Sequence, residues 1–383
     1  MRTRNFIAAD LGASNGRTIL GRFNGKKFTL TELNRFNNNY IRIGDAYYWD
    51  VLYLYTCIKQ GMQIYAGKYS GALSGFGIDT WGVDFGLIDR QGRLIGNPRS
   101  YRDPRGARGF RFFYDKYDEK TVFNLTGIAN LAINTAYHLH DMVVSKDPQL
   151  EIADKLLLIP DLLSYMFSGT ISTEFTNATT MQMLSLSGTW SKEMIKMVGI
   201  PDTLLSDIQK SGEIKGRLIA SIANEIGFSE IPAVICVGSH DTASAVASVP
   251  TTEDDFAFIS SGTWSLIGVL SDTPIINDHA HNNHFSNEGT VEGRYRPLRN
   301  IMGLWIIQCC KRQWERKEKL DWDDIVNMAR TAPASSRLST STTRSSLRVI
   351  ICRKKYSNIA RIRASQYPKQ KARSPVSFMK AWQ

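Results

Sequence analysis

The feature that most constrains the fold is a pair of short apolar runs joined by a glycine-containing turn, which the chain carries twice. The first copy spans residues 5–23, with its turn at 10–17. The second copy spans residues 256–270, with its turn at 261–263. A strand, turn and strand of this kind begin a β-sheet. Because the device recurs about 250 residues later, the sequence predicts two related α/β domains.

The segments between the two copies predict alternating strands and helices. A third apolar run at 29–36 extends the first hairpin into a meander. Residues 50–65 have helical spacing and begin at Asp50, a residue type that caps helices. The other predicted elements are strands at 73–78, 83–88 and 233–237, a mostly helical stretch at 115–230 and a helix at 242–247. This order is typical of a mixed sheet covered by helices.

Length and composition exclude several classes of protein. The chain has 383 residues, 43% of them hydrophobic, which is enough for two buried cores. It has no run of about 18 uncharged apolar residues, so we expect no membrane span. Residues 1–12 lack the pattern of a signal peptide. Five cysteines without a CxxC pair predict a reduced, cytoplasmic protein rather than a disulfide or zinc scaffold.

The net charge of +11 comes from the end of the chain. Residues 331–383 hold 12 of the 47 basic residues and none of the 36 acidic ones, so the rest has a net charge of −1. The same segment holds none of the 29 glycines. A basic arm that binds nucleic acid does not need to lack both acidic residues and glycine. We therefore interpret residues 334–383 as a disordered Ser/Arg-rich tail that is read out of frame after a one-base deletion. A nucleic-acid-binding arm is the alternative.

The turn at residues 10–17 is the first candidate functional site. A strand that ends in an acid and continues into small residues and glycine exposes successive backbone N–H groups to an anion. Asp10 is suited to hold Mg²⁺, usually through water, and Arg17 to pair with phosphate oxygens. The alternative is an ordinary glycine-containing hairpin turn.

Five motifs together resemble those of the FGGY family of carbohydrate kinases, within the actin/hexokinase/Hsp70 superfamily. They are DLGAS at 10–14, GIDTWGVDF at 77–85, SHDTAS at 239–244, SSGTWS at 260–265 and NEG…EGRYR at 287–296. Their order and spacing make the resemblance specific over about residues 4–333. It implies a two-domain actin/hexokinase-like (ribonuclease H-like) α/β fold whose second domain is truncated here. The implied domains are 1–243 for sugar and phosphate and 244–333 for part of the C-terminal domain.

The resemblance also implies a role for individual residues. The nucleotide-binding residues it implies are Ala13, Ser14, Asn15, Gly16 and Arg17 at the first turn, with Thr263 and Gln308 from the second domain. The sugar-binding residues it implies are Asp79, Trp81, Gly82, His240, Asp241, Thr242 and Asn300. Asp10 would lie near Mg²⁺, and Asp241 would be the proton acceptor.

Phosphoryl transfer explains why the family uses these residue types. The protein mainly aligns the reactants and neutralises charge. A primary hydroxyl needs a nearby carboxylate to take its proton. Asp241 follows a buried strand and begins a helix, which places a carboxylate at a strand end. Its alternative role is that of a helix N-cap, and Asp79 and Asp84 have a comparable structural role as strand-end turn residues.

The implied reaction is transfer of the γ-phosphate of ATP to O1 of L-rhamnulose, with Mg²⁺ as cofactor. A kinase for another 6-deoxyketose such as L-fuculose is one alternative. A sugar-binding protein without catalysis is another, because the glycine-rich adenine loop of the family is missing from this sequence. We expect a monomer with a sugar and ATP as its partners, and neither nucleic acid nor membrane.

Overall fold

The computed structural model describes residues 3–253, 256–316 and 319–331. The predicted tail at 334–383 lies outside the described residues. The chain divides into two compact units. Of the described residues, the first unit holds those between 3 and 258 and 268–299, and the second holds 259–267 and those between 300 and 331. The predicted domain boundary at residue 243 stays a prediction. No helix in the described part of the chain is long and apolar enough to cross a membrane.

A six-stranded mixed sheet organises the first unit, with the strand order β11-β12-β6-β1-β2-β3. Its strands are β1 (Arg4–Leu11), β2 (Asn15–Phe23), β3 (Phe28–Asn37), β6 (Leu73–Thr80), β11 (Ile214–Arg217) and β12 (Ala233–Ile235). The first three form the predicted antiparallel meander. β1, β6 and β12 run parallel to one another at the centre. The carboxyl ends of these three strands therefore meet at one edge.

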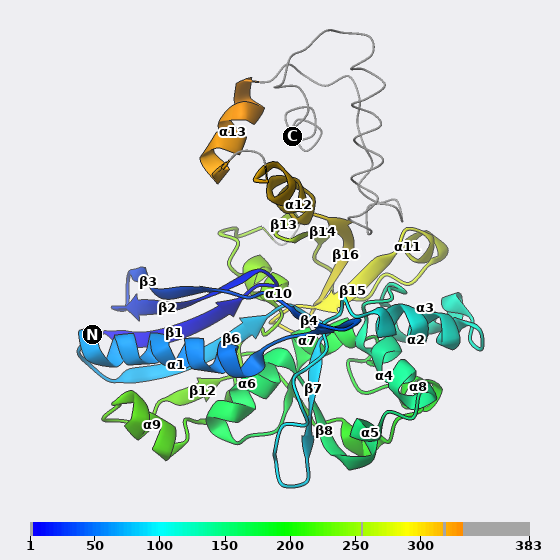
Figure 1. Cartoon of the computed structure of the whole chain (residues 1–383), viewed down its shortest axis with the longest axis horizontal. Coiled ribbons are helices and arrows are strands. Elements are labelled where there is room, and N and C mark those ends of the chain that lie inside the picture. Colours follow the sequence, from blue (N-terminus) through cyan, green and yellow to red (C-terminus); the bar gives the residue numbers. More distant parts are fainter. Residues whose placement is uncertain (1–2, 254–255, 317–318, 332–383) are drawn as a thin grey trace. The chain divides into compact units, whose positions relative to one another are not determined.

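Helices α1 (Val51–Lys68), α6 (Ile159–Ser168) and α9 (Ala220–Ile226) pack together against this sheet (Figure 1). α1 begins where the sequence predicts, because the side chain of Asp50 accepts a hydrogen bond from Tyr53 N at 3.0 Å. The core between helices and sheet includes Phe76 and Ile58, which are fully buried. α10 (Asp241–Ala247) follows β12 and confirms the predicted helix at 242–247.

A helical subdomain occupies much of the predicted helical stretch. Its elements are α2 (Pro104–Tyr114), α3 (Glu119–Thr126), α4 (Thr135–Val144), α5 (Pro148–Ile152), α7 (Phe175–Ala178) and α8 (Lys192–Val198), with 3-10 turns at Thr179–Met181 and Asp202–Leu204. The stretch also contains β8 (Ala153–Leu158), β9 (Thr173–Glu174) and β10 (Ile208–Gln209). β8 pairs antiparallel with β7 (Phe85–Asp89). A further small hairpin joins β4 (Ile41–Ile43) to β5 (Ala46–Tyr48).

The second copy of the strand–turn–strand device is also present. β13 (Ala257–Ser261) and β14 (Trp264–Val269) lie in a four-stranded sheet of order β13-β14-β16-β15. β15 (Phe285–Gly289) and β16 (Tyr295–Met302) form an antiparallel hairpin after the short helix α11 (Asp278–Asn282). Two helices, α12 (Trp305–Trp314) and α13 (Trp322–Thr331), follow.

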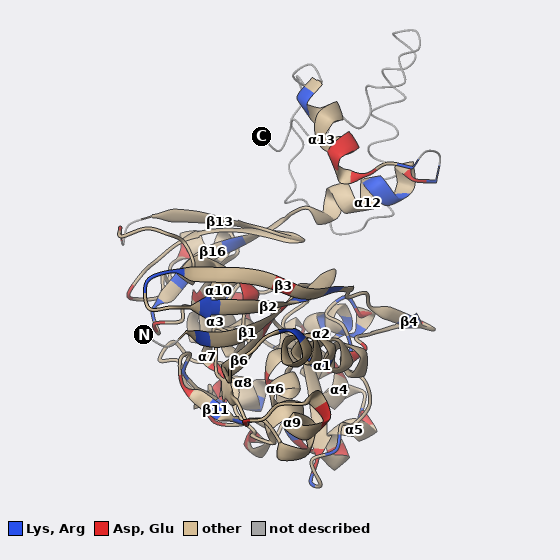
Figure 2. Cartoon of the chain, turned by 90° about the vertical axis from the view of Figure 1, so that its left-hand side faces the viewer, with Lys and Arg blue, Asp and Glu red and all other residues tan. Residues whose placement is uncertain are grey.

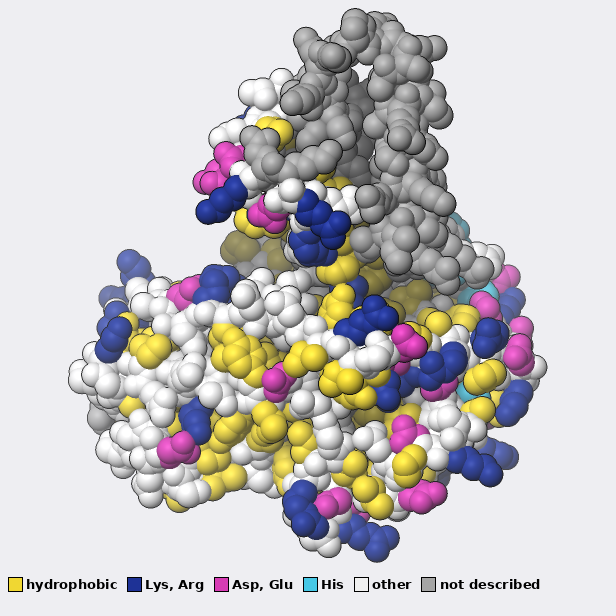
Figure 3. Space-filling view, viewed as in Figure 1, with side chains coloured by type: hydrophobic (Ala, Val, Ile, Leu, Met, Phe, Trp, Pro, Cys, Tyr) yellow, Lys and Arg dark blue, Asp and Glu magenta, His cyan; other side chains and the backbone are white. Residues whose placement is uncertain are grey.

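Charged and apolar side chains are mixed over the described surface. Lys and Arg are interspersed with Asp and Glu over the described chain (Figure 2), which agrees with the net charge of −1 outside residues 331–383. On the face seen in Figure 3, hydrophobic side chains lie among charged and polar ones. The predicted mixed sheet is confirmed by the meander β1–β3, and the helices predicted to cover it are confirmed by α1, α6 and α9.

Glycine makes the contact between α2 and α4 possible. A Cβ added to Gly109 would lie 1.9 Å from the carbonyl oxygen of Tyr137, and one added to Gly106 would lie 2.3 Å from His138 Nε2. We predict that Gly109→Ala lowers the free energy of unfolding by about 1–3 kcal/mol, because the helices must separate. Gly67→Ala is the matched control. Gly67 lies in α1 with open space around it, so alanine should stabilise the protein by about 0.5–1 kcal/mol.

Urea unfolding of both variants tests this prediction. Equal effects of the two substitutions would contradict the close helix crossing.

Candidate functional site at the carboxyl edge of the parallel strands

Strand register brings three predicted carboxylates to one edge of the sheet. Asp10 of β1 pairs with Asp79 of β6 in the parallel register. Thr80 forms a parallel bridge with His240, which directly precedes Asp241. The three acids come from segments far apart in sequence, and the charges of Asp10 and Asp241 both act on Asp79. The edge therefore concentrates negative charge.

Burial and this concentration of charge change the pKa values of two aspartates at the edge, Asp79 and Asp241. Burial raises the pKa of Asp79 well above its ordinary value, and the charges of Asp10 and Asp241 raise it further. The pKa of Asp241 is also raised, chiefly by desolvation, although 37% of its side chain is exposed. Carboxylates that are costly to ionise together are typical of sites that bind cations or handle protons.

Asp10 and Arg17 form an ion pair across the first hairpin. Arg17 Nη2 and Nε donate to Asp10 Oδ2 at 2.8 and 2.9 Å. Both side chains are partly exposed, at 41% for Arg17 and 32% for Asp10. The residue predicted for Mg²⁺ and the one predicted for phosphate are thus in direct contact.

The turn between β1 and β2 is held in a fixed shape. Gly12 N donates to Asn15 O at 2.8 Å. The buried Asn38 binds the turn twice, through its side-chain amide to Gly12 O at 2.7 Å and its N–H to Ser14 O at 3.1 Å. At Gly16, a Cβ would lie 2.4 Å from the ring of Phe36. Of the five predicted nucleotide-binding residues in this turn, all but Gly16 are at least partly exposed.

A buried carboxylate fixes the loop that carries His240 and Asp241. Glu174 Oε2 accepts from Ser239 N at 3.1 Å and from Ser239 Oγ at 2.8 Å. Thr176 Oγ1 donates to the same oxygen at 2.6 Å and accepts from His240 N at 3.2 Å. Thr80 N completes the loop by donating to Ser239 O at 2.9 Å. The position of Asp241 therefore depends on Glu174, which is fully buried.

The side chains that follow this loop face one another. His240 Nε2 lies 3.6 Å from Asp241 Oδ1, and Thr242 Oγ1 donates to the same oxygen at 3.1 Å. His240 Nδ1 lies 3.1 Å from Glu288 Oε2. His240, Thr242 and Glu288 are buried. The structure thus places Glu288 against the sequence-predicted residues 240–242.

The segment at Trp81 and Gly82 forms a rigid wall beside this edge. Asp84 Oδ2 accepts from Trp81 Nε1 at 2.8 Å and from Trp49 Nε1 at 2.5 Å, and the two rings lie 4.3 Å apart. A Cβ on Gly82 would lie 2.8 Å from the side chain of Thr180. Val83 has φ of 69°, a strained conformation for a β-branched residue. Strain of this kind often occurs at functional sites.

Three predicted residues belong to the second unit. Thr263 lies in the turn between β13 and β14, and its carbonyl oxygen accepts from Trp305 N at 3.2 Å. Gly303 approaches this turn so closely that a Cβ would lie 2.6 Å from Gly262 O. Gln308 lies one turn into α12, and Asn300 lies in β16. Thr263 and the start of α12 are therefore neighbours.

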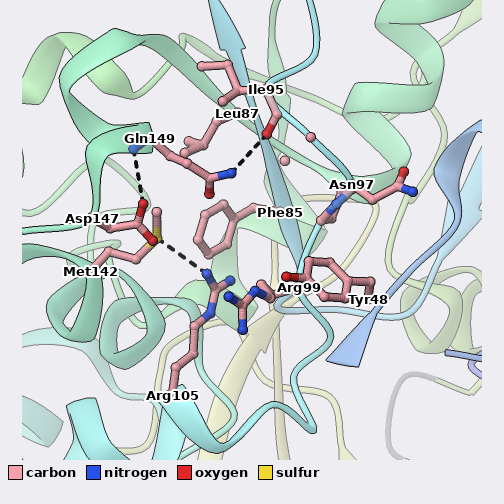
Figure 4. A pocket seen from close by; sticks show the side chains of 13 residues that line it. Tyr48, Phe85, Leu87, Ile95, Asn97, Arg99, Arg105, Met142, Asp147 and Gln149 are labelled. Carbon is pink, nitrogen blue, oxygen red and sulfur yellow. Dashed lines mark hydrogen bonds between the residues drawn. The ribbon is translucent and has the colours of Figure 1, made fainter. Parts of the chain in front are cut away.

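A cavity of about 200 Å³ lies elsewhere in the first unit (Figure 4). Its lining includes Phe85 of β7 and the guanidinium groups of Arg99 and Arg105. Arg105 is buried, and its Nε donates to His138 Nδ1 at 3.0 Å. Among the described residues that line this cavity, none is a predicted site residue. We therefore place the site at the strand edge, where the functional groups converge.

Sequence reasoning missed the residues that support the site. Asn38 and Glu174 received no role, and Glu288 and Arg296 were noted only as part of the motif at 287–296. Glu174 stands in an ordinary polar stretch at 172–180, which carries no distinguishing signal. Its role depends on contacts with residues 65 positions away.

The donor set at the edge fits Mg²⁺. The ion is usually held by one or two carboxylates together with water and substrate phosphates. Asp10 and Asp79 are neighbours in register, and their mutual repulsion is reflected in the raised pKa of Asp79. No cluster of three or more His, Cys, Asp or Glu residues suited to a metal occurs among the described residues. A Mg²⁺ site that is completed by substrate phosphates does not require such a cluster of side chains.

Comparison with known families identifies the class. The FGGY family of carbohydrate kinases matches through its N-terminal domain over residues 6–247 and through its C-terminal domain over residues 257–364. The chain belongs to this family. The C-terminal match continues past residue 333, so it does not support the predicted end of the family sequence there.

Within this family, the chain is similar to proteins named rhamnulokinase. A rhamnulokinase from Bacteroides thetaiotaomicron is 40% identical over 312 residues, covering 81% of this chain and 64% of the relative. One from Pectobacterium atrosepticum is 36% identical over 337 residues, covering 87% and 66%. The chain thus spans about two thirds of the length of these relatives.

Solved structures share the fold. A xylulose kinase from Lactobacillus acidophilus superposes with a TM-score of 0.72 at 16% identity, covering 86% of this chain and 66% of the other. A Plasmodium falciparum glycerol kinase with ADP gives 0.70 at 14% identity, covering 87% and 67%. The predicted two-domain actin/hexokinase-like fold is confirmed.

Asp84 makes stability depend on pH. Burial raises its pKa to about 7, so the folded chain holds a proton that the unfolded chain loses near pH 4. Its contribution to stability is therefore full below about pH 4 and is lost as the pH rises toward 7. Asp84→Asn keeps a hydrogen-bond acceptor for the indoles and cannot titrate. We predict that the variant gains about 1 kcal/mol relative to wild type for each pH unit between about 5 and 7.

Unfolding free energies measured across this pH range test the prediction. Asp45→Asn is the control, because the side chain of Asp45 is 98% exposed. A constant difference between wild type and Asp84→Asn would contradict the raised pKa.

Proposed function

We propose that the chain is a kinase that transfers the γ-phosphate of ATP to O1 of L-rhamnulose. The observation that carries the proposal is the set of relatives named rhamnulokinase, 36–40% identical over 81–87% of this chain. Since the chain spans about two thirds of those relatives, the activity of this polypeptide is itself part of the proposal. The carboxylates at the sheet edge support it, because Asp10, Asp79 and Asp241 all lie within the first unit.

Asp241 is the proposed general base. Its side chain is partly exposed, and its position at the start of α10 is fixed by the loop that Glu174 holds. A carboxylate that takes the proton of a primary hydroxyl as the phosphorus–oxygen bond forms contributes roughly 10²–10⁴-fold to the rate. The raised pKa of Asp241 makes it a stronger base than an ordinary aspartate.

The remaining sugar contacts surround this base. His240 and Thr242 flank Asp241, and Gly82 with Trp81 supplies the wall beside it. Asp79 lies at the neighbouring strand end, and Asn300 is the proposed contact from the second unit. The bonds of Asp84 to both indoles keep the wall from moving. A rigid wall lowers the ordering cost of binding.

The nucleotide is proposed to bind the turn at residues 13–17. Backbone N–H groups of this turn and the guanidinium of Arg17 would bind phosphate oxygens. Thr263 and Gln308 are the proposed contacts from the second unit. Asp10, with Asp79 beside it, would hold Mg²⁺, which when bound neutralises charge on the phosphates. The partners proposed are therefore a ketose and ATP, with the protein acting as a monomer.

The first experiment measures ADP release by the whole chain with L-rhamnulose and with L-fuculose. We expect turnover with L-rhamnulose and a kcat/KM at least about tenfold lower with L-fuculose, since a misplaced hydroxyl leaves a buried polar group unpaired. Higher kcat/KM with L-fuculose would reassign the substrate. Calorimetric binding of L-rhamnulose without ADP release would replace the kinase by a sugar-binding protein.

Asp241→Asn tests the base. We predict a fall in kcat of about 10²-fold or more with a nearly unchanged dissociation constant for L-rhamnulose, because the amide keeps the shape and cannot accept the proton. Asp45→Asn is the control on the exposed surface. Full turnover in Asp241→Asn would show that another group takes the proton.

A further inference from the structure

We propose that Glu288 and Arg296 are positioning residues that hold His240 in its Nδ1–H tautomer, so that Nε2 accepts a hydroxyl hydrogen of the sugar beside Asp241. This inference deepens the proposed function and rests on it. It assigns a role to a buried polar group that the general-base mechanism does not use. Glu288 and Arg296 stand directly opposite each other in the β15–β16 hairpin.

The three side chains form a buried network, in which Arg296 Nη1 has no hydrogen-bond partner among the described residues. Glu288 Oε2 lies 3.1 Å from His240 Nδ1 and 3.1 Å from Arg296 Nη2. Arg296 Nη2 lies 3.3 Å from His240 Nδ1, and Arg296 Nε donates to Gly289 O at 2.9 Å. The exposed fractions are 7% for His240, 5% for Glu288 and 0% for Arg296. Buried groups of this kind need every partner they have.

His240 Nδ1 lies between an acceptor, Glu288 Oε2 at 3.1 Å, and a donor, Arg296 Nη2 at 3.3 Å, and the shorter contact to the carboxylate favours a proton on Nδ1. Arg296 does not need Nδ1 as a partner, because it also donates to Glu288 Oε2 and Gly289 O. A carboxylate can only accept hydrogen bonds and a guanidinium can only donate them. Without a proton on Nδ1, the lone pairs of Nδ1 and Glu288 Oε2 would face each other at 3.1 Å. With the proton on Nδ1, Glu288 accepts from both His240 and Arg296. The ring nitrogen that carries the proton is thus set by its partner, as in other oriented histidines.

The positive charge of Arg296 favours the ionised form of Glu288, which is the form that can accept a hydrogen bond from His240 Nδ1. Arg296 is fully buried, and Glu288 is its carboxylate partner. The pair therefore brings a fixed negative charge to Nδ1 without a net charge in the core.

A proton on Nδ1 leaves the other ring nitrogen of His240, Nε2, free of a proton. In this tautomer Nε2 carries a lone pair and lies 3.6 Å from Asp241 Oδ1. Two acceptors at this separation form no hydrogen bond with each other, and both can receive hydroxyl hydrogens. A sugar that places one hydroxyl on Asp241 and a second on Nε2 satisfies both. A polyol with suitably spaced hydroxyls is thus the class of ligand that this arrangement selects.

The tautomer can be measured without any kinase activity. The full chain is labelled with ¹⁵N-histidine, and the signals of His240 among the six histidines are identified with His240→Asn. In two-bond ¹⁵N–¹H spectra at a pH where the ring is neutral, we expect a protonated Nδ1 in wild type. We expect the Nε2–H form to be populated in Glu288→Gln, since the amide can donate to Nδ1. An Nε2–H tautomer in wild type, or the same spectrum in both proteins, would overturn the proposal.

Binding then tests the role toward the sugar. We expect Glu288→Gln to raise the KM and the calorimetric dissociation constant for L-rhamnulose about tenfold, with the KM for ATP unchanged. Glu288→Asp, which keeps the charge, should recover part of the loss and serves as the second variant if Glu288→Gln does not fold. Glu225→Gln is the matched control, because Glu225 is an exposed partner of Lys59.

A double-mutant cycle separates positioning from general stability. In the His240→Asn background, Glu288→Gln should cause little further loss of sugar affinity, because Glu288 acts through the imidazole. The same tenfold loss in both backgrounds would overturn the proposal. Absence of ADP release from every variant would contradict the proposed kinase function, while the tautomer spectra would still decide the role of Glu288 and Arg296.

Discussion

The structure depends on the parallel alignment of β1, β6 and β12. Parallel strands bring their carboxyl ends to one edge, and each of these ends carries or precedes an aspartate. Asp10, Asp79 and Asp241 consequently share a region where full ionisation is costly, and burial together with mutual repulsion raises the pKa of Asp79. Such an arrangement costs stability, which is the usual consequence of building a functional site.

Buried polar groups supply the precision of this edge. Glu174 holds the loop before Asp241, Asn38 holds the first turn, and Asp84 joins two tryptophans. Each carboxylate or amide is largely buried and hydrogen-bonded. Because a buried polar group that loses its partner costs about 1–3 kcal/mol or more, these bonds favour a single arrangement. The residues proposed to touch the sugar can therefore remain in place before it binds.

Much of the fold could be predicted from the sequence. Apolar alternation identified the meander at 5–36, and the capping Asp50 located α1, because both signals are local. The short strand β8 was missed, since it lies inside a helical stretch and is formed through pairing with β7. The candidate residues came from motifs. Glu174 lies in no motif, and the contacts that Glu288 and Arg296 of the motif at 287–296 make with His240 join distant segments. Sequence spacing does not encode such contacts.

The most direct test of the carboxylate edge is the free energy of unfolding of Asp79→Asn at about pH 8. The amide removes the cost of either protonating or ionising a half-buried acid beside Asp10 and Asp241. We predict that the variant is more stable than wild type by about 1 kcal/mol or more at this pH. An Asp79→Asn protein less stable than wild type would show that Asp79 is an ordinary structural residue and would contradict the account.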